Sequence, residues 1–137
     1  MVTFDIDTAR KVLAAQPFSV LLGARVKVFE KGRAVLALDI REDLKQQNGF
    51  VHGGVLAYAA DNAITFAAGS TLGPDVLTSG VTISYVRPAS GVALEAEAEV
   101  TYTGRRQAVC RCDLYAVAED GARVLSAIAQ GSVLSVA

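Results

Sequence analysis

The sequence is poor in the residues that build metal sites, disulfide frameworks and nucleic-acid-binding surfaces. Its 137 residues include 2 Cys, 1 His, 3 Pro and no Trp, and its formal net charge is −1. His52 is the sole histidine and Cys110 and Cys112 are the only cysteines, so no Cys/His cluster of ordinary spacing can form and we expect no metal site. The two cysteines stand two apart on an expected strand, where they suit a mutual disulfide poorly. The near-neutral charge gives no overall attraction to nucleic acid, and we expect no such partner.

Signals for export and for membrane insertion are also weak. The amino terminus, MVTFDIDTARK, carries acids early and has no apolar core, so the cytoplasm is the expected location. Between Gly49 and Gly73 the only ionisable side chains are His52 and Asp61. A membrane-spanning helix would place Asp61 near the bilayer centre at a cost of roughly 2.5–3.5 kcal/mol, so we expect a buried helix and no membrane span.

What the sequence does contain describes one folded unit. It is 52% hydrophobic and 20% charged, and its length fits a single domain over residues 1–137. Periodicity predicts two helices: a short one over 7–16 that Pro17 stops, and a buried one from Gly53 to about Ala68 that ends at Gly69 and Gly73-Pro74. It also predicts two strands within 24–40, joined by a turn at Lys31-Gly32. Further strands are predicted over 76–86, 91–103, 107–118 and 123–136. In the short helix, we expect the side chains of Leu13 and Ala14 to point inward. The later strands alternate strictly, which favours an antiparallel sheet with one wet face. We expect an α+β domain in which one long helix packs on five or six strands.

The segment from Gln46 to Ser70 holds the residues best suited to chemistry. His52, Gly53 and Gly54 stand at the start of the long helix, where unpaired N–H groups favour negative charge and glycine lets a ligand approach the backbone. Asp61 lies in the middle of the same helix, although aspartate is a poor helix former and is costly to bury as an anion. A thioester hydrolase needs both parts, because donors stabilise the oxyanion and a carboxylate activates water or attacks directly. A buried structural role for Asp61 is the alternative reading.

The spacing of these two parts sets a geometric condition. Asp61 follows Gly53 by eight residues, so they stand ~12 Å apart along one helix. One Asp61 therefore cannot act on a thioester held at its own Gly53. Two antiparallel helices from two subunits would remove the mismatch, so we expect a homo-oligomer with active sites shared between subunits.

This segment resembles the hotdog-fold thioesterases of the phenylacetate-degradation type, which are related to the 4-hydroxybenzoyl-CoA thioesterases. The resemblance rests on Gln47-Asn48-Gly49, Val51-His52-Gly53-Gly54 and Ala60-Asp61-Asn62-Ala63, and it extends to PFSVLLGARV, to Thr78 ahead of ISYVRPA, and to Gly104-Arg105-Arg106. It implies a hotdog fold, with the sheet wrapped around the central helix, and dimers that associate into tetramers.

The resemblance also implies roles for single residues. Gly53 would supply the oxyanion-hole N–H, and His52 would orient that loop or the thioester. Asp61 would be the nucleophile or the general base, supplied by the opposite subunit, and Thr78 would orient the attacking water. Asn48 matches an amide residue whose spacing from the histidine varies among relatives.

Several further residues are candidates for binding substrate. Gly54 adds to the close backbone approach at the helix start. Arg105 and Arg106 at an expected hairpin tip, and Arg87 before Pro88, could meet the phosphates of coenzyme A, although arginines at hairpin tips are usually just solvated.

We therefore expect hydrolysis of an acyl-CoA, with an aryl or a short- or medium-chain acyl group, to a free acid and coenzyme A, without a cofactor. A hotdog hydratase or dehydratase is an alternative, but it would need an Asp and a His close together in one loop, and Asp43 precedes His52 by nine residues. A non-catalytic acyl-CoA-binding module is another, but such a module would usually lose the acid at position 61.

Overall fold

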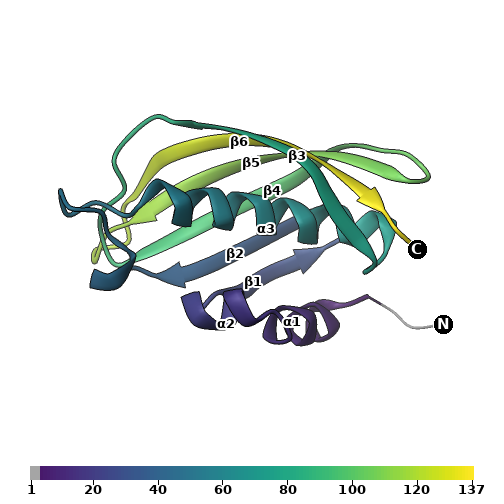
Figure 1. The fold of residues 1–137 in the computed structure, drawn as a ribbon, viewed down its shortest axis with the longest axis horizontal. Helices are drawn as coiled ribbons and strands as arrows, with labels where there is room; N and C mark the ends of the chain where they lie inside the picture. Colours follow the sequence, from purple (N-terminus) through teal and green to yellow (C-terminus); the bar gives the residue numbers. More distant parts are fainter. Residues whose placement is uncertain (1–3) are drawn as a thin grey trace.

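The computed structural model describes residues 4–137, in which one antiparallel sheet of six strands curves around a long helix (Figure 1). The strand order across the sheet is β1-β2-β4-β5-β6-β3. The elements are α1 (Ile6–Ala14), α2 (Pro17–Leu22), β1 (Arg25–Glu30), β2 (Arg33–Asp39), the 3₁₀ turn η1 (Glu42–Leu44), α3 (Gly53–Leu72), β3 (Val76–Tyr85), β4 (Ala93–Thr103), β5 (Gln107–Val117) and β6 (Arg123–Ser135).

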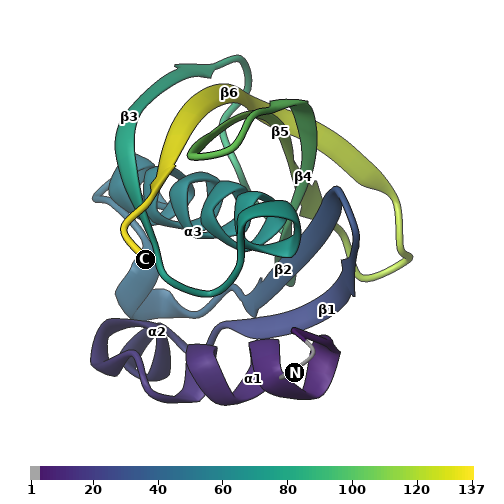
Figure 2. The same ribbon diagram turned by 90° about the vertical axis from the view of Figure 1, so that its right-hand side faces the viewer.

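The sheet wraps around α3, as the end-on view shows (Figure 2). Helix α3 packs against all six strands, and α1 and α2 lie beside β1, outside the curl of the sheet. The core is therefore enclosed by the concave face of the sheet on most sides of α3. The predicted α+β hotdog fold, with five or six antiparallel strands around one central helix, is confirmed.

Small residues let α3 lie close to the sheet. Alanines occupy most of its buried positions, and Ile64 on the same helix is completely buried. On β6, a Cβ built on Gly131 would come within 3.2 Å of the Ile64 side chain and 3.1 Å of the Gly80 carbonyl oxygen. Helix and sheet meet at this glycine because no side chain separates them.

The end of α3 differs from the prediction. We expected the helix to stop at about Ala68 and Gly69, but it continues to Leu72 with Gly69 buried inside it. Gly69 lets the Phe4 ring pack closely against α3, since a Cβ there would lie 3.0 Å from the ring. The helix ends at Gly73, whose φ of +99° favours glycine.

Pro17 ends one helix and also begins another. The helix predicted over 7–16 spans Ile6–Ala14, and Pro17 occupies the first position of α2, which the sequence analysis missed. Proline is favoured there because its fixed φ suits a helix and its missing N–H has no intrahelical acceptor. Leu13 is buried as expected, but Ala14 is exposed and Ala9 takes the inward position.

Two further expectations concern the cysteines and the membrane. Cys110 and Cys112 are buried and unpaired, and burial raises the pKa of the first to about 11 and, with a smaller effect from Asp113, that of the second to about 12. Both are therefore neutral thiols at pH 7 and poor nucleophiles. Among the described residues, no helix is both long enough and apolar enough to cross a bilayer.

The core predicts a measurable contrast between two leucines. Leu114→Ala on β5 removes a side chain that is 1% exposed, and it should lower the free energy of unfolding by about 2–5 kcal/mol because it leaves a cavity. Leu21→Ala on α2, where the side chain is 65% exposed, is the matched control and should change it by less than about 0.5 kcal/mol. Urea unfolding at one fixed protein concentration measures both. Equal losses would contradict the assignment of the core to the space between α3 and the sheet.

Candidate active site

Asp61 is held by two threonines on the face of α3 that looks toward β3. The Thr78 hydroxyl donates to Asp61 Oδ1 at 2.7 Å, and the Thr65 hydroxyl, one helical turn later, donates to the Asp61 carbonyl oxygen at 2.9 Å. The two threonine oxygens also lie 2.9 Å apart. A register shift between Thr78 and Gly80 interrupts the pairing of β3 with β6 at this point, and such irregularities re-aim side chains. The fold thus brings together Asp61 and Thr78, two of the predicted site residues.

The start of α3 is built by the His52-Gly53-Gly54 sequence. His52 is the N-cap residue, and its Nδ1 accepts a hydrogen bond from the Gly54 N–H at 2.8 Å. A Cβ on Gly54 would lie 3.1 Å from that same nitrogen, so a glycine there leaves room for the imidazole to cap the helix. The Gly53 N–H has no acceptor within residues 4–137. It is an unused donor at the positive end of the helix dipole, which suits an oxyanion.

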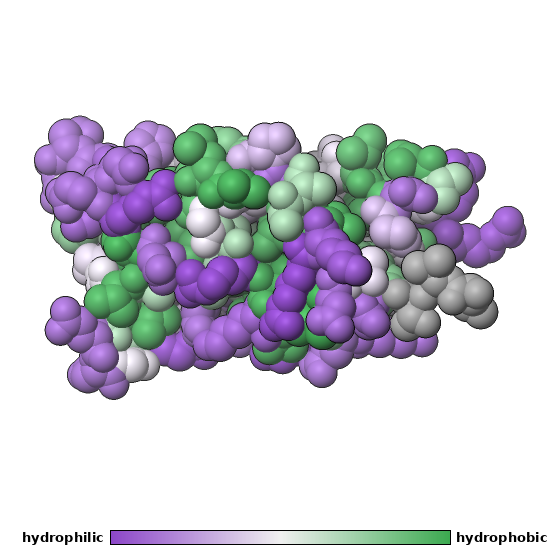
Figure 3. Space-filling view, turned by 90° about the horizontal axis from the view of Figure 1, so that it is seen from below, coloured by the Kyte–Doolittle hydropathy of each residue, from purple (hydrophilic) through white to green (hydrophobic). Residues whose placement is uncertain are grey.

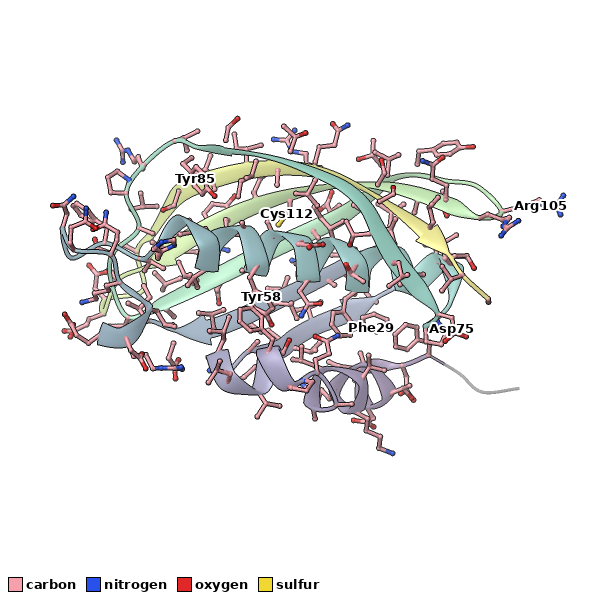
Figure 4. The ribbon with its side chains drawn as sticks, viewed as in Figure 1. Phe29, Tyr58, Asp75, Tyr85, Arg105 and Cys112 are labelled. Atoms are coloured by element: carbon pink, nitrogen blue, oxygen red, sulfur yellow. The ribbon has the colours of Figure 1, made fainter. Side chains whose placement is uncertain are left out.

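Tyr85 also belongs to this end of the site, and the sequence analysis missed it. Its hydroxyl donates to the Gly53 carbonyl oxygen at 3.0 Å, and its ring lies 3.3 Å from where a Gly53 Cβ would be. Figure 4 shows it at the amino-terminal end of α3. Its place at the end of the predicted strand 76–86 was visible in the sequence, but only the return of β3 along α3 brings it to Gly53.

Within one chain, Gly53 and Asp61 open into different pockets. A pocket of about 350 Å³ is lined by Gly53, Tyr85 and Arg87 among others, and a second of about 300 Å³ by Asp61, Tyr58 and Thr78 among others. The two pockets share no lining residue. The carboxylate and the amide are separated along α3 as their spacing predicts, so one chain does not combine them at one thioester.

A partly buried polar network lines the Asp61 pocket. Ser19 is 1% exposed; its hydroxyl donates to Gln16 Oε1 at 2.6 Å and accepts from the Tyr58 hydroxyl at 2.6 Å. Asn62 Nδ2 lies within hydrogen-bonding distance of Gln16, Ser19 and Tyr58, at 3.0, 3.2 and 3.1 Å. Tyr58 points from α3 toward α2 in Figure 4, and the Phe18 ring packs edge-on against it at 5.3 Å.

Helical spacing could have revealed part of this network. Tyr58 and Asn62 are i and i+4 on α3 and so share a face next to Asp61. Gln16 and Ser19 carry no such signal, since their side chains meet α3 only through tertiary packing. The face that carries α1 and α2 mixes apolar and polar side chains, and Phe18 is 57% exposed there (Figure 3).

The remaining predicted residues fall in three places. Arg87 is exposed beside Gly53, in the same pocket. Arg105 and Arg106 lie at the exposed β4–β5 hairpin tip, at the opposite end of the molecule from Tyr85 (Figure 4), and neither side chain forms an ion pair within the described chain. Asn48 is exposed in the loop before α3; its backbone N–H donates to Gln46 Oε1, and Gln46, not Asn48, lines the Gly53 pocket.

Asp43, the acid that the hydratase alternative would need, lies in η1. It is exposed and pairs with Arg41, whose Nε lies 2.7 Å from its carboxylate. Asp43 lines neither pocket, and no hydrogen bond joins its side chain to His52 among the described residues.

Comparisons with known proteins identify the family of the chain. Residues 48–122 match the profile of the Thioesterase superfamily. The chain is 33% identical over 86 residues to a 1,4-dihydroxy-2-naphthoyl-CoA hydrolase of Listeria monocytogenes, a match that covers 61% of this chain and 70% of that protein.

Solved structures give the same result. A thioesterase family protein of Silicibacter pomeroyi superposes with a TM-score of 0.88 at 31% identity, over 93% of this chain and 95% of that one. A mutant of the phenylacetic acid degradation protein PaaI of Thermus thermophilus superposes with a TM-score of 0.77 at 32% identity, over 88% of this chain and 100% of that one.

The match to the Thioesterase superfamily profile covers more than half of the chain, and the fold agrees with it. The chain belongs to the thioesterase superfamily, and the expectation that it is an acyl-CoA thioester hydrolase is confirmed.

Proposed function

We propose that two copies of this chain form each active site, which hydrolyses the thioester of an aryl-type acyl-CoA. The observation that carries the proposal is the separation of Gly53 and Asp61 into two pockets of one chain. Attack on a thioester requires the reacting groups to lie ~3 Å apart, against ~12 Å along α3. A two-fold axis that sets two α3 helices antiparallel places each Asp61 at the partner's Gly53.

In the shared site, the residues divide the reaction between them. The Gly53 N–H donates to the thioester carbonyl oxygen and holds the negative charge that develops there. Asp61 takes a proton from a water as the water oxygen bonds to the carbonyl carbon, and the Thr78 hydroxyl fixes the carboxylate. The C–S bond then breaks, and the coenzyme A thiolate leaves and takes the proton from Asp61, which restores the carboxylate. His52 keeps the loop in place through its bond to Gly54.

The acyl group is proposed from the surroundings of Asp61 and from the relatives. The Phe18 and Tyr58 rings line the Asp61 pocket and offer an edge-on aromatic wall. The Listeria monocytogenes relative is named for a naphthoyl-CoA and the Thermus thermophilus relative for phenylacetic acid degradation. These features support an aryl acyl group over a straight chain. We propose further that the enzyme is a single cytoplasmic domain whose dimers associate into tetramers.

Asp61→Asn should lower kcat at least about 100-fold while the fold and the oligomer persist, because the amide cannot accept the proton. Thioester cleavage over an aryl-CoA panel measures it, and Asp120→Asn in the exposed β5–β6 turn is the matched control. Near wild-type turnover would contradict the role of Asp61.

Single turnover in ¹⁸O-water should leave Asp61 unlabelled, since a label there would indicate that the carboxylate attacks directly as the nucleophile.

The shared site predicts complementation between two inactive variants. Gly53→Pro removes the oxyanion donor at a position where proline suits a helix, and the His52 ψ of 136° already fits a following proline. Mixed with Asp61→Asn subunits, it should form hybrid dimers with one intact site and one doubly defective site. An equal mixture should recover about one quarter of wild-type activity, because half of the dimers are hybrids with one working site.

Co-expression with two affinity tags isolates the hybrids, and each variant mixed with itself is the control. Hybrids without activity would contradict the shared site, as would a fully active wild-type monomer in analytical ultracentrifugation.

Arg105→Ala combined with Arg106→Ala should raise KM for acyl-CoA and leave kcat nearly unchanged, because contacts to coenzyme A phosphates stabilise ground and transition states alike. Figure 4 shows Arg105 at the end of the molecule that lies beyond the carboxyl end of α3. The increase should disappear with an acyl-pantetheine, which lacks the nucleotide phosphates. Lys11→Ala on exposed α1 is the charge control. An equal rise in KM for acyl-CoA and for acyl-pantetheine would show that Arg105 and Arg106 do not act through the phosphates of coenzyme A.

A further inference from the structure

A second, smaller cavity adjoins the Asp61 pocket. It measures about 150 Å³ and shares Gln16, Thr65 and Val76 with that pocket. Its other lining residues are mostly apolar: Phe4, Val12, Phe66, Gly69 and Pro74. On α3, Asp61, Thr65 and Gly69 follow at intervals of four and therefore share one face. The cavity thus continues from the carboxylate toward the carboxyl end of α3, for ~12 Å as far as Gly69.

The far end of this cavity is closed by aromatic rings. Phe4 and Phe29 lie 4.7 Å apart between ring centroids, and Phe29 packs edge-on against Phe66 at 6.3 Å. Phe4 also fills the space that a side chain at Gly69 would need. A group that enters from Asp61 therefore meets an apolar wall, which suits a compact acyl group and excludes a long chain.

Gln16 stands at the junction of the two spaces with its carboxamide fixed. Its Oε1 accepts from the Ser19 hydroxyl and from Asn62 Nδ2, so both lone pairs of this oxygen are engaged. The amide nitrogen is on the other side of the carboxamide, and its two N–H groups have no acceptor among residues 4–137. Gln16 is half-buried and lines both spaces, so this nitrogen is a donor that is open to a bound group.

We infer that Gln16 is a specificity-determining residue that donates a hydrogen bond from Nε2 to an uncharged oxygen on the acyl group, as that group passes from Asp61 into the apolar cavity. The substrate class is then a compact, ring-sized acyl-CoA that carries one hydroxyl or carbonyl oxygen some way from the thioester. This inference rests on the proposed function, because it takes the Asp61 pocket as the entry for the acyl group. A net hydrogen bond corresponds to about tenfold in kcat/KM.

The test compares kcat/KM for benzoyl-CoA with that for its three hydroxy and three formyl isomers. Wild-type protein should favour at least one oxygenated isomer in each series by about tenfold. Gln16→Glu keeps an oxygen for Ser19 and Asn62 but replaces the NH₂ group with a second acceptor. It should therefore abolish the preference for the formyl isomer, which cannot donate, and keep part of the preference for the hydroxy isomer, which can.

Two controls separate specificity from structure. Gln130→Glu, on the exposed outer face of β6, makes the same chemical change elsewhere and should keep every ratio. Gln16→Leu should lower the ratio of kcat/KM for the oxygenated isomer to that for benzoyl-CoA, in both the hydroxy and the formyl series. The inference is overturned if wild-type protein shows no preference, if it hydrolyses no member of the panel, or if the Gln16 variants lower all substrates equally.

Asp61→Asn on the same panel distinguishes this inference from the proposed function. Suppose that Asp61→Asn abolishes all turnover, while the Gln16 variants keep the wild-type ratio of kcat/KM between each oxygenated isomer and benzoyl-CoA. The catalytic proposal then stands and the role of Gln16 is rejected.

Discussion

A single stiff helix carries both the Gly53 amide, the proposed oxyanion donor, and the Asp61 carboxylate, the proposed base, and it holds them apart. Because α3 is enclosed by the sheet and packed through alanines and the glycine at position 131, it cannot bend to bring Gly53 and Asp61 together. Thr78 holds the Asp61 carboxylate, and His52 caps the helix start at Gly53, so each half of the proposed site is fixed by its own neighbours. A second copy of the chain is the simplest source of the missing half, and catalysis would then depend on assembly.

The polar network beside α2 has a different physical role from the catalytic groups. Ser19 is almost fully buried and Asn62 and Gln16 are half-buried, so loss of one member would leave at least one polar group with little access to water and without its partner. Such a network fixes where α2 sits on α3. Through α2 it also fixes Phe18 over the Asp61 pocket, so the shape of the acyl site depends on bonds that touch no reacting atom.

The fold and the central acid could be predicted because they leave periodic signals. The strands alternate, α3 is apolar nearly all round, and an aspartate in such a helix is conspicuous in the sequence. Gly69 misled the prediction because a glycine inside a helix looks the same in sequence as one that ends it, and only the Phe4 ring distinguishes the two. Tyr85 and Gln16 depend on contacts across 32 and 46 positions of the chain, which periodicity does not encode.

If the site is divided between subunits, the residues that select the acyl group can change independently of those that bind the thioester oxygen. Each chain builds its acyl cavity from α1, α2, α3 and the start of β3, next to its own Asp61. The partner would contribute the amide at Gly53, which binds an oxygen that every thioester possesses. Changes in Phe4, Val12 or Gln16 can then alter the accepted acyl group without disturbing the oxyanion loop. Because the two functions sit on opposite halves of α3, this fold can keep one chemistry while it changes substrate.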